Sequence, residues 1–271
     1  MGTDIKQLRT RIKSVDSTLH LTKAMGLVAS SKIRKATDAM NKGKAYARAL
    51  SEMVAQLTRS RACQRSPYMA ERDGDRTCLV VIAGDRGLAG GYNANIFRIL
   101  REHTGLQIIP IGKRACDRYG AGGEPLYAER FTRADAKRIA DAVCADFLAD
   151  KFDRFGIVCT KYHSLMSQEA YVKWVLPLQA QETPAKATAD TIFEPDEVTV
   201  LNAMIPDYVA GMIGAAVRES FACEVAARRV AMDSAGKNAG ELIDRLGLEY
   251  NRARQSAITQ EITEIVAGSG V

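Results

Sequence analysis

The first part of the chain carries apolar or small side chains at alternating spacings of three and four residues, without a break. These seam positions are Ile5, Leu8, Ile12, Val15, Leu19, Thr22, Gly26, Ala29, Ile33, Ala36, Met40, Gly43, Ala47, Leu50, Val54 and Leu57. A period of 3.5 residues is typical of a coiled coil, because it keeps one stripe of each supercoiled helix against its partner. At 1.5 Å per residue the predicted helix would extend for about 80 Å. It therefore needs a partner of similar length.

Several of these seam positions hold small side chains in place of the leucine or isoleucine that would pack most strongly. They are Thr22, Gly26, Ala29, Ala36, Gly43 and Ala47. The separation of two packed helices depends on the side chains at their contact. We therefore expect the partner helix to come close along this stretch.

The last part of the chain supplies a candidate partner with the same alternation of spacings, at Ala239, Ile243, Leu246, Tyr250, Ala253 and Ala257. Upstream of position 236 the register is poorer, because Arg229 falls in a seam position. All prolines lie between positions 67 and 206, so both ends lack the residue that breaks helices. The pattern predicts an antiparallel pair, formed by a helix within 1–62 and a returning helix within 196–271.

The middle of the chain, residues 68–195, has a different pattern. Short apolar, β-branched runs predict four strands, at 77–84, 106–112, 155–162 and 171–178. Helical spacing at 91–103 and 133–150 separates the strands, which predicts a small Rossmann-like α/β domain with a parallel or mixed sheet. The stretch 179–197, rich in alanine, threonine, proline and acidic residues, is expected to connect this domain to the returning helix.

One glycine-rich loop lies between a predicted strand and a predicted helix, where phosphate-binding loops also lie. Its glycines are Gly84, Gly87, Gly90 and Gly91. The loop has neither the Gly-Lys-Ser/Thr of a P-loop nor the glycine spacing of a dinucleotide site. We favour a structural turn in which the glycines allow positive φ, and an anion or nucleotide site remains the alternative.

Other candidate chemistry is sparse. The histidines, His20, His103 and His163, lie in three different predicted elements without a nucleophile nearby, so we expect surface or packing roles. The six cysteines have no metal-ligand spacing and are expected to be reduced and mostly buried. No long uncharged apolar run or secretory signal is evident. We therefore expect no catalytic site, no cofactor, no metal and no small-molecule substrate.

Positive charge is concentrated at one end of the chain. Residues 1–61 carry thirteen lysines and arginines against four acidic residues, whereas residues 207–271 carry seven basic against nine acidic residues. A basic helix is compatible with nucleic-acid binding, but here the charge surrounds an unbroken seam and has no interleaved aromatic residues. A solvated coiled-coil face or a surface for protein partners explains the charge better, and a small α/β enzyme using the glycine-rich loop is a further alternative.

Three stretches resemble one known family, the gamma subunit of F-type ATP synthases. Residues 21–36 (LTKAMGLVASSKIRKA) are similar to its N-terminal signature and residues 251–266 (NRARQSAITQEITEIV) to its C-terminal signature. Residues 83–96 (AGDRGLAGGYNANI) are similar to the entry into its α/β domain. The three stretches occur in the order and at the spacing of the family.

The resemblance implies a rotor shaft without a catalytic site of its own. In the family, the paired helices turn inside a hexamer of alternating alpha and beta subunits, and the α/β domain contacts the epsilon subunit and the membrane c-ring. The resemblance assigns beta-subunit contacts to Arg254, Gln255, Thr259, Gln260, Glu261, Lys23, Lys32 and Lys35. It assigns c-ring or foot contacts to Phe193, Glu194, Asp196 and Tyr208, and it places the segment 265–271 in an apolar bearing of the hexamer.

This sequence departs from the family pattern at several positions. Gly26 stands where the family usually has a longer, often basic residue, Val225 and Arg229 replace more typical polar and methionine residues, and Phe193 replaces a tyrosine. Each departure puts an individual contact in doubt. The chain begins at the helix, without a transit peptide, so we expect a bacterial protein that lies peripherally on the cytoplasmic face of the cell membrane and binds no nucleic acid.

Overall fold

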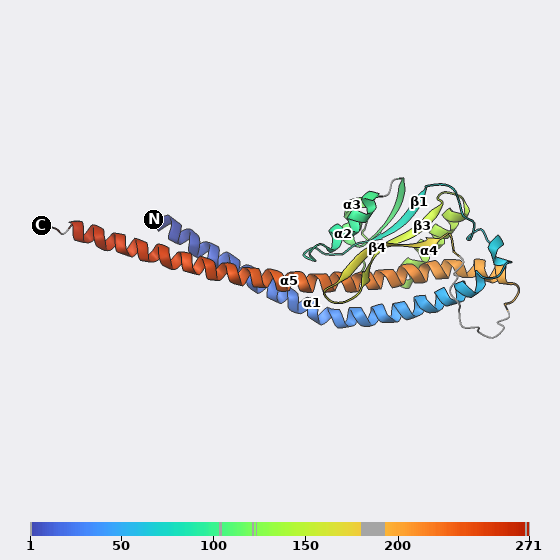
Figure 1. Ribbon diagram of the computed structural model, residues 1–271, viewed down its shortest axis with the longest axis horizontal. Coiled ribbons are helices and arrows are strands. Elements are labelled where there is room, and N and C mark those ends of the chain that lie inside the picture. The colour runs from blue at the N-terminus through green and yellow to red at the C-terminus, as the bar shows by residue number, and fades with distance from the viewer. Residues whose placement is uncertain are drawn as a thin grey trace. The chain divides into compact units, whose positions relative to one another are not determined.

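A computed structural model describes residues 2–102, 105–120, 122, 124–179, 193–268 and 270. The chain divides into two compact units, and each is described by itself. One consists of Met1–Ser30 and Arg228–Val271, and the other of Ser31–Ala227. Two long helices, α1 (Gly2–Leu57) and α5 (Glu197–Gly268), contribute to both units. The predicted helices at the two ends of the chain are therefore confirmed (Figure 1).

The predicted seam of α1 is buried or half-buried at every position from Ile5 to Leu57. In the smaller unit, a Cβ atom placed on Gly26 would lie 3.7 Å from the Cβ of Met232, and one placed on Gly236 would lie 3.6 Å from Thr22 Oγ1. The residue numbers of the contacting positions decrease along α5 as they increase along α1, so the two helices are antiparallel. The close approach confirms the prediction made from the small seam residues.

The larger unit continues the antiparallel pairing. Ala36 and Met40 of α1 form a small buried cluster with Ala222 of α5. Further along α1, a Cβ atom on Gly43 would lie 3.5 Å from the Cα of Ala215. Glycine and alanine at these positions allow the two backbones to meet without large side chains between them.

Helix α5 begins before Pro206 and contains it. Proline lacks the backbone N–H, so the helix loses one hydrogen bond at this point. The helix also contains a window long and apolar enough to cross a membrane by length and composition, of which 61% is buried inside the structure. The expectation of no long uncharged apolar run holds, since charged residues interrupt every such stretch of α5. A largely buried core helix has the same composition.

A four-stranded sheet forms the centre of the larger unit, in the order β2-β1-β3-β4. The strands are β1 (Thr77–Ile82), β2 (Leu106–Ile111), β3 (Arg154–Tyr162) and β4 (Gln168–Leu176). Strand β1 pairs in parallel with β2 and β3, whereas β3 and β4 are antiparallel. The four predicted strands and the mixed α/β sheet are confirmed.

Three shorter helices accompany the sheet (Figure 1). They are α2 (Tyr92–Ile99), α3 (Lys113–Tyr119) and α4 (Arg133–Leu148). Single turns of 3-10 helix follow α1 at Cys63–Arg65 and α2 at Leu100–Glu102. A reciprocal capping box between Thr132 and Asp135 begins α4. The predicted helices at 91–103 and 133–150 are confirmed, and α3 was not predicted.

Five of the six cysteines are buried, as expected, and Cys116 is half-buried. Burial raises the pKa of Cys78 and of Cys159 to about 12 and that of Cys144 to about 11. A thiol reacts through its thiolate form, so these side chains are unreactive packing groups.

A buried carboxylate ties the start of β1 to the start of β3. Asp153 is 2% exposed and accepts hydrogen bonds from Arg76 Nη2 at 2.7 Å and Arg76 Nε at 3.1 Å. These hydrogen bonds hold the pKa of Asp153 below its ordinary value. The stabilisation is complete above the unfolded-state pKa of about 4 and is lost as the pH falls through the folded-state value.

We predict that Asp153→Asn flattens the acid limb of the stability curve, because its amide cannot take up this proton. Between pH 5 and pH 3 the variant should lose less unfolding free energy than the unmodified chain, with a slope smaller by up to about one proton. Urea unfolding of both proteins across this range measures the difference. Parallel curves below pH 4 would show that Asp153 does not link protonation to stability.

Candidate functional site

The glycine-rich loop, residues 84–91, follows β1 at the carboxyl end of a parallel strand. Ligands of open α/β sheets bind at this edge. The amide of Gly84 donates a hydrogen bond to Asn93 Oδ1 at 2.9 Å, which fixes the start of the loop against α2. The next two amides are therefore the ones that a bound anion would use.

A carboxylate from α5 occupies those two amides. Glu224 accepts hydrogen bonds from the backbone N–H of Asp85 at 3.3 Å and of Arg86 at 3.2 Å, and it is only 2% exposed. A Cβ atom on Gly84 would lie 2.9 Å from Glu224 Cδ, so glycine is needed for the close approach. The chain thus supplies the anion of its own loop, which favours the structural role over a nucleotide site.

Asp85, which belongs to the loop, binds backbone groups outside it. Its carboxylate accepts hydrogen bonds from the backbone N–H groups of Lys113 at 3.3 Å, Ala128 at 2.9 Å and Glu129 at 2.8 Å. The loop therefore joins α5, the start of α3 and the segment before α4 through two buried carboxylates.

The loop uses positive φ at only some of its positions. Among the described loop residues, Gly90 (57°) and the non-glycine Leu88 (59°) have positive φ, whereas Gly91 has φ of −80°. Gly84 and Gly87 instead provide space: a Cβ on Gly87 would lie 3.0 Å from Arg114 Nη2.

Sequence reasoning did not identify Glu224. A usable signal was present, because Glu224 is a single acidic residue within the otherwise apolar run 222–226. A charged residue that is fully buried needs compensating partners. A lone acid in a buried helix face therefore indicates a nearby group of donors, although the sequence does not show where they lie.

The proposed beta-subunit contacts on α5 are all exposed. They are Arg254, Gln255, Thr259, Gln260 and Glu261. Thr259 Oγ1 donates a hydrogen bond to the carbonyl of Gln255 at 2.9 Å, and Gln260 donates to Glu264 at 2.9 Å. Only Ala253 and Ala257 of this stretch remain half-buried in the seam. These polar side chains are therefore open to solvent.

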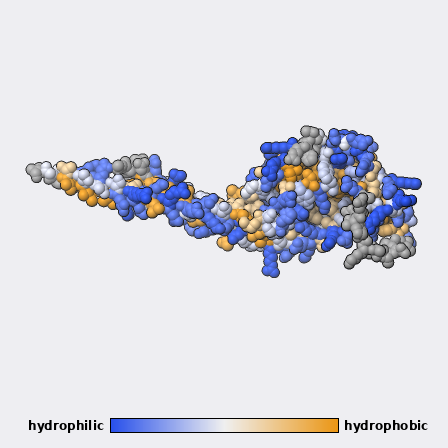
Figure 2. All heavy atoms as spheres, in the orientation of Figure 1, coloured by the Kyte–Doolittle hydropathy of each residue, from blue (hydrophilic) through white to orange (hydrophobic). Residues whose placement is uncertain are grey.

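Exposed apolar residues continue along the same end of α5. Ile258, Ile262, Ile265 and Val266 are 47%, 55%, 69% and 64% exposed, and their spacing places them on one helix face. Figure 2 shows apolar surface along these C-terminal turns. Sequence reasoning had marked only the end of this stripe, from residue 265.

The three candidate lysines of α1 differ in their surroundings. Lys23 and Lys35 are exposed. Lys32 instead contacts Glu129 through an ion pair with Nζ–Oε1 of 2.5 Å, and this hydrogen bond lowers the pKa of Glu129. Lys32 therefore fastens α1 to the α/β domain within the larger unit and is less available for a partner than the other two.

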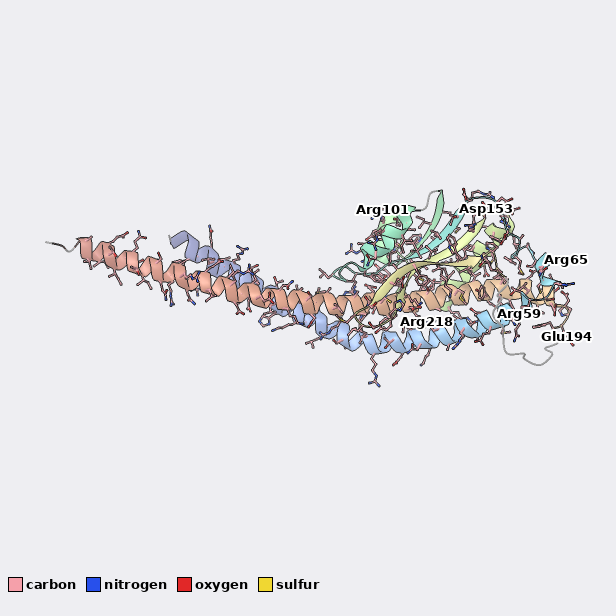
Figure 3. All side chains as sticks on the ribbon, viewed as in Figure 1. Arg59, Arg65, Arg101, Asp153, Glu194 and Arg218 are labelled. Atoms are coloured by element: carbon pink, nitrogen blue, oxygen red, sulfur yellow. The ribbon has the colours of Figure 1, made fainter. Side chains whose placement is uncertain are left out.

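The foot residues lie near the start of α5. Figure 3 shows Glu194 at the same end of the larger unit as Arg59 and Arg65. Asp196 accepts hydrogen bonds from the amides of Val198 at 3.0 Å and Thr199 at 2.9 Å, which caps the helix and, with the Thr199 hydroxyl, lowers the pKa of Asp196.

The two aromatic foot residues differ from this polar pair. Phe193 and Tyr208 are half-buried and pack against the main core, and burial raises the pKa of Tyr208. Glu194, by contrast, is exposed together with Asp196. A partner at the foot would therefore meet these two acidic side chains together with the exposed Arg59 and Arg65.

Two of the histidines lie beside acidic side chains. His20 lies 3.7 Å from Asp16, and His163 lies 3.1 Å from Glu169. His103 is outside the described residues. Within the described part of the chain, no group of three or more histidine, cysteine or acidic side chains could hold a metal ion.

Gly26 and Arg229, two of the departures from the family pattern, lie against each other in the smaller unit. A Cβ atom on Gly26 would lie 3.0 Å from Arg229 Nη1, so the arginine of α5 occupies the space left by the missing side chain of α1. Val225 is buried and 1% exposed. The seam position that weakened the predicted register is thus filled by a side chain that reaches across to the opposite helix.

The comparisons with known sequences cover nearly the whole chain. Residues 4–270 match the family described as ATP synthase. The ATP synthase gamma chain of Ruminococcus albus is 39% identical, with 98% of each chain covered. The protein of Acetobacterium woodii named ATP synthase gamma chain, sodium ion specific, is 35% identical, with 99% of each chain covered.

Solved structures support the same fold. A chain in the mitochondrial ATP synthase of Euglena gracilis in rotational state 3 has a TM-score of 0.69 and 20% identity, covering 99% of this chain and 94% of that chain. A rotor chain of the same enzyme in rotational state 1 has a TM-score of 0.63 and 19% identity, with 95% and 100% covered.

Proposed function

Because the chain belongs to the ATP synthase gamma-chain family, whose members form the central-stalk rotor and hold no catalytic site, we propose which of its surfaces meet each partner. The C-terminal turns of α5 contact the alpha and beta subunits through Arg254 and Gln255, with Thr259, Gln260 and Glu261 beside them. The observation that carries this proposal is the exposure of these polar side chains beside an apolar stripe on one helix.

The apolar stripe suits a bearing. Ile258, Ile262 and Ile265 present exposed aliphatic side chains at spacings of four and three residues along the helix. Burial of such surface is favourable in any orientation, since the hydrophobic effect is not directional. An apolar ring around the stripe therefore holds the shaft without fixing its angle of rotation.

Charge provides the angular preference. The basic side chains of α1, including Lys23 and Lys35, face solvent, whereas the C-terminal part of α5 carries a nearly balanced charge. A shaft with unequal sides contacts identical subunits differently at each angle. Differences in contact free energy then favour one conformation of each catalytic site in turn.

At the other end, Phe193, Glu194, Asp196 and Tyr208 contact the epsilon subunit and the c-ring. Support comes from the Euglena structure, whose description includes a c-ring. With this assignment the protein would lie peripherally at the cytoplasmic face of a bacterial membrane. Its proposed parts are an N-terminal helix within 1–62, an α/β domain at 68–195 and a C-terminal helix within 196–271. The comparisons do not support a nucleic-acid-binding coiled coil, and family membership replaces the alternative of an independent α/β enzyme.

Reconstitution with alpha and beta subunits tests the proposal. We expect the chain to copurify with them in a fixed ratio and ATP hydrolysis to appear only in the complex. The variant Arg254→Ala with Gln255→Ala should then lower coupled ATP synthesis in membrane vesicles at least fivefold, because the proposed polar contacts to one beta subunit are lost.

A matched control removes one arginine and one side-chain amide from the adjoining turn. Asn251→Ala with Arg252→Ala should retain at least half of the synthesis, and circular dichroism should show both variants folded. Equal losses in the two variants, or normal synthesis in the first, would contradict the contact assignment. Nucleotide hydrolysis by the isolated chain would contradict the rotor function itself.

A further inference from the structure

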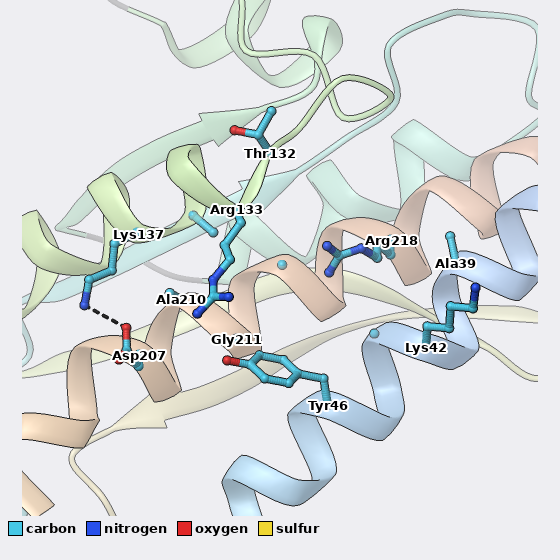
Figure 4. Close-up of a pocket in the computed structure, with 13 residues that line it drawn as sticks. Ala39, Lys42, Tyr46, Thr132, Arg133, Lys137, Asp207, Ala210, Gly211 and Arg218 are labelled. Carbon is cyan, nitrogen blue, oxygen red and sulfur yellow. Dashed lines mark hydrogen bonds and ion pairs between the residues drawn. The ribbon is translucent and has the colours of Figure 1, made fainter.

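A cavity of about 370 Å³ lies in the larger unit between α1, α4 and α5, and no role in rotation accounts for it (Figure 4). Its volume falls within the range of roughly 300–1,000 Å³ of small-molecule sites. We propose that this cavity binds a small phosphorylated molecule, with the phosphate on Arg133 and Arg218 and the organic body on a floor of glycine and alanine.

The charge of the lining points to an anion. Four basic residues, Lys42, Arg133, Lys137 and Arg218, line the cavity with a single carboxylate, Asp207. That carboxylate already binds Lys137 at 2.8 Å. In the described part of the chain, neither arginine forms an ion pair with an acidic residue. Two guanidinium groups thus share one cavity without a counter-charge, and a dianion would supply it.

The position of Arg218 is set by glycines from two helices. A Cβ atom on Gly43 would lie 3.2 Å from Arg218 Cδ, and one on Gly214 would lie 3.3 Å from Arg218 Nη1. The side chain therefore lies across both glycines. Figure 4 shows Arg133 extending from α4 toward the same space beside α5. The planar fork of arginine matches phosphate oxygens in pairs.

The helix that carries Arg133 adds to this preference. Arg133 is the first residue of α4, directly after the capping residue Thr132. The N-terminus of a helix bears a partial positive charge, part of which Asp135 offsets through the capping box. The guanidinium of Arg133 adds a full charge beside it, which a bound phosphate would neutralise and a neutral ligand would not.

The remaining lining suits an apolar body. Ala39, Ala136 and Ala210 line the cavity with three glycines, Gly43, Gly211 and Gly214. The ring of Tyr46 lies over Gly211, since a Cβ atom there would be 3.3 Å from Tyr46 Cε1. Tyr46 is 46% exposed, which leaves one side of the ring open to a ligand.

Calorimetric titration of the full chain with phenyl phosphate, inorganic phosphate and benzoate at constant ionic strength tests the site. We expect saturable binding of phenyl phosphate at one site. Inorganic phosphate, without the apolar body, should bind at least threefold more weakly, and benzoate, with one charge, at least fivefold more weakly. Absence of saturable phenyl phosphate binding, or equal affinity for all three anions, would overturn the proposal.

Variants separate this site from general attraction to a basic protein. Arg133→Ala and Arg218→Ala should each weaken phenyl phosphate binding at least tenfold. Gly214→Leu should weaken it as much by filling the cavity, and it should fold because its nearest neighbour is the flexible end of Arg218. Arg138→Ala, which removes the same charge from α4 outside the cavity, should change the affinity less than twofold. An equal loss in Arg138→Ala would contradict a defined site.

Discussion

Glu224→Ala should lower the free energy of unfolding by about 3 kcal/mol, because it leaves two buried backbone donors without their acceptor. The amides of Asp85 and Arg86 lie in the loop after β1 and donate to this carboxylate. An unsatisfied buried hydrogen-bonding group costs about 1–3 kcal/mol. The loss of the side chain also leaves a cavity beside Gly84. Urea unfolding of the full chain, followed by circular dichroism, measures the change.

Two controls separate the hydrogen bonds from simple loss of volume. Glu224→Gln keeps one carbonyl acceptor of the same length and should cost about 1 kcal/mol. Formate is small enough to enter the space in the alanine variant and should raise its thermal midpoint more than that of the unmodified chain. Chloride at the same ionic strength should not. If formate stabilises both proteins equally, the amides do not form the anion cradle that we describe.

Gly112→Ala should be more damaging still, with an expected loss of about 4 kcal/mol. Gly112 has φ of 88° and ψ of 140°, a region that side-chain-bearing residues rarely adopt. A Cβ atom there would also lie 2.0 Å from the carbonyl oxygen of Ala83, so one backbone segment must move. That movement would disturb the hydrogen bond from Gly112 N to Leu126 O, which is 2.7 Å long.

Gly105→Ala provides the matched control. Gly105 also has positive φ, 66°, but nothing lies within 4 Å of its Cβ position. The left-handed conformation alone costs about 1–2 kcal/mol for a residue with a side chain. The difference between the two variants, measured by urea unfolding, therefore isolates the clash with Ala83. Similar losses of unfolding free energy in both variants would show that the backbone near Gly112 can move to relieve the clash at no cost in stability.

The long helices were predictable because their information is local and repeated. Every seam position from Ile5 to Leu57 proved buried or half-buried, since sixteen positions at one period outweigh any single unusual residue. The strands were predictable for a similar reason: continuous β-branched runs such as β1 are typical of a sheet covered on both faces.

The parts that sequence reasoning missed depend on distant contacts. Helix α3 has only seven residues, most of them polar, so its pattern is too short to recognise. The occupant of the glycine-rich loop, Glu224, lies about 140 residues further along the chain. Arg229 interrupts the apolar seam in the sequence pattern, but its side chain fits in the structure because Gly26 on the opposite helix leaves room for it. Neither pairing is visible without the fold.

The candidate contact residues are a separate case. Nothing in the periodicity of α5 distinguishes Arg254 from Arg252, because both flank the same seam. Only the resemblance to a family assigned them different roles. Exposure supports both as contact residues equally well, which is why the paired alanine variants are the informative comparison.

The buried cysteines give the protein a practical property. Their thiols are shielded by the core, and burial raises their pKa values, so maleimide reagents would find few reactive sulfur atoms in the native chain. Cys116, half-buried and also raised in pKa, is the main position to replace. A single new cysteine on an exposed turn of α5 would then carry a fluorescent or magnetic marker, so that the angle of the shaft could be followed one molecule at a time.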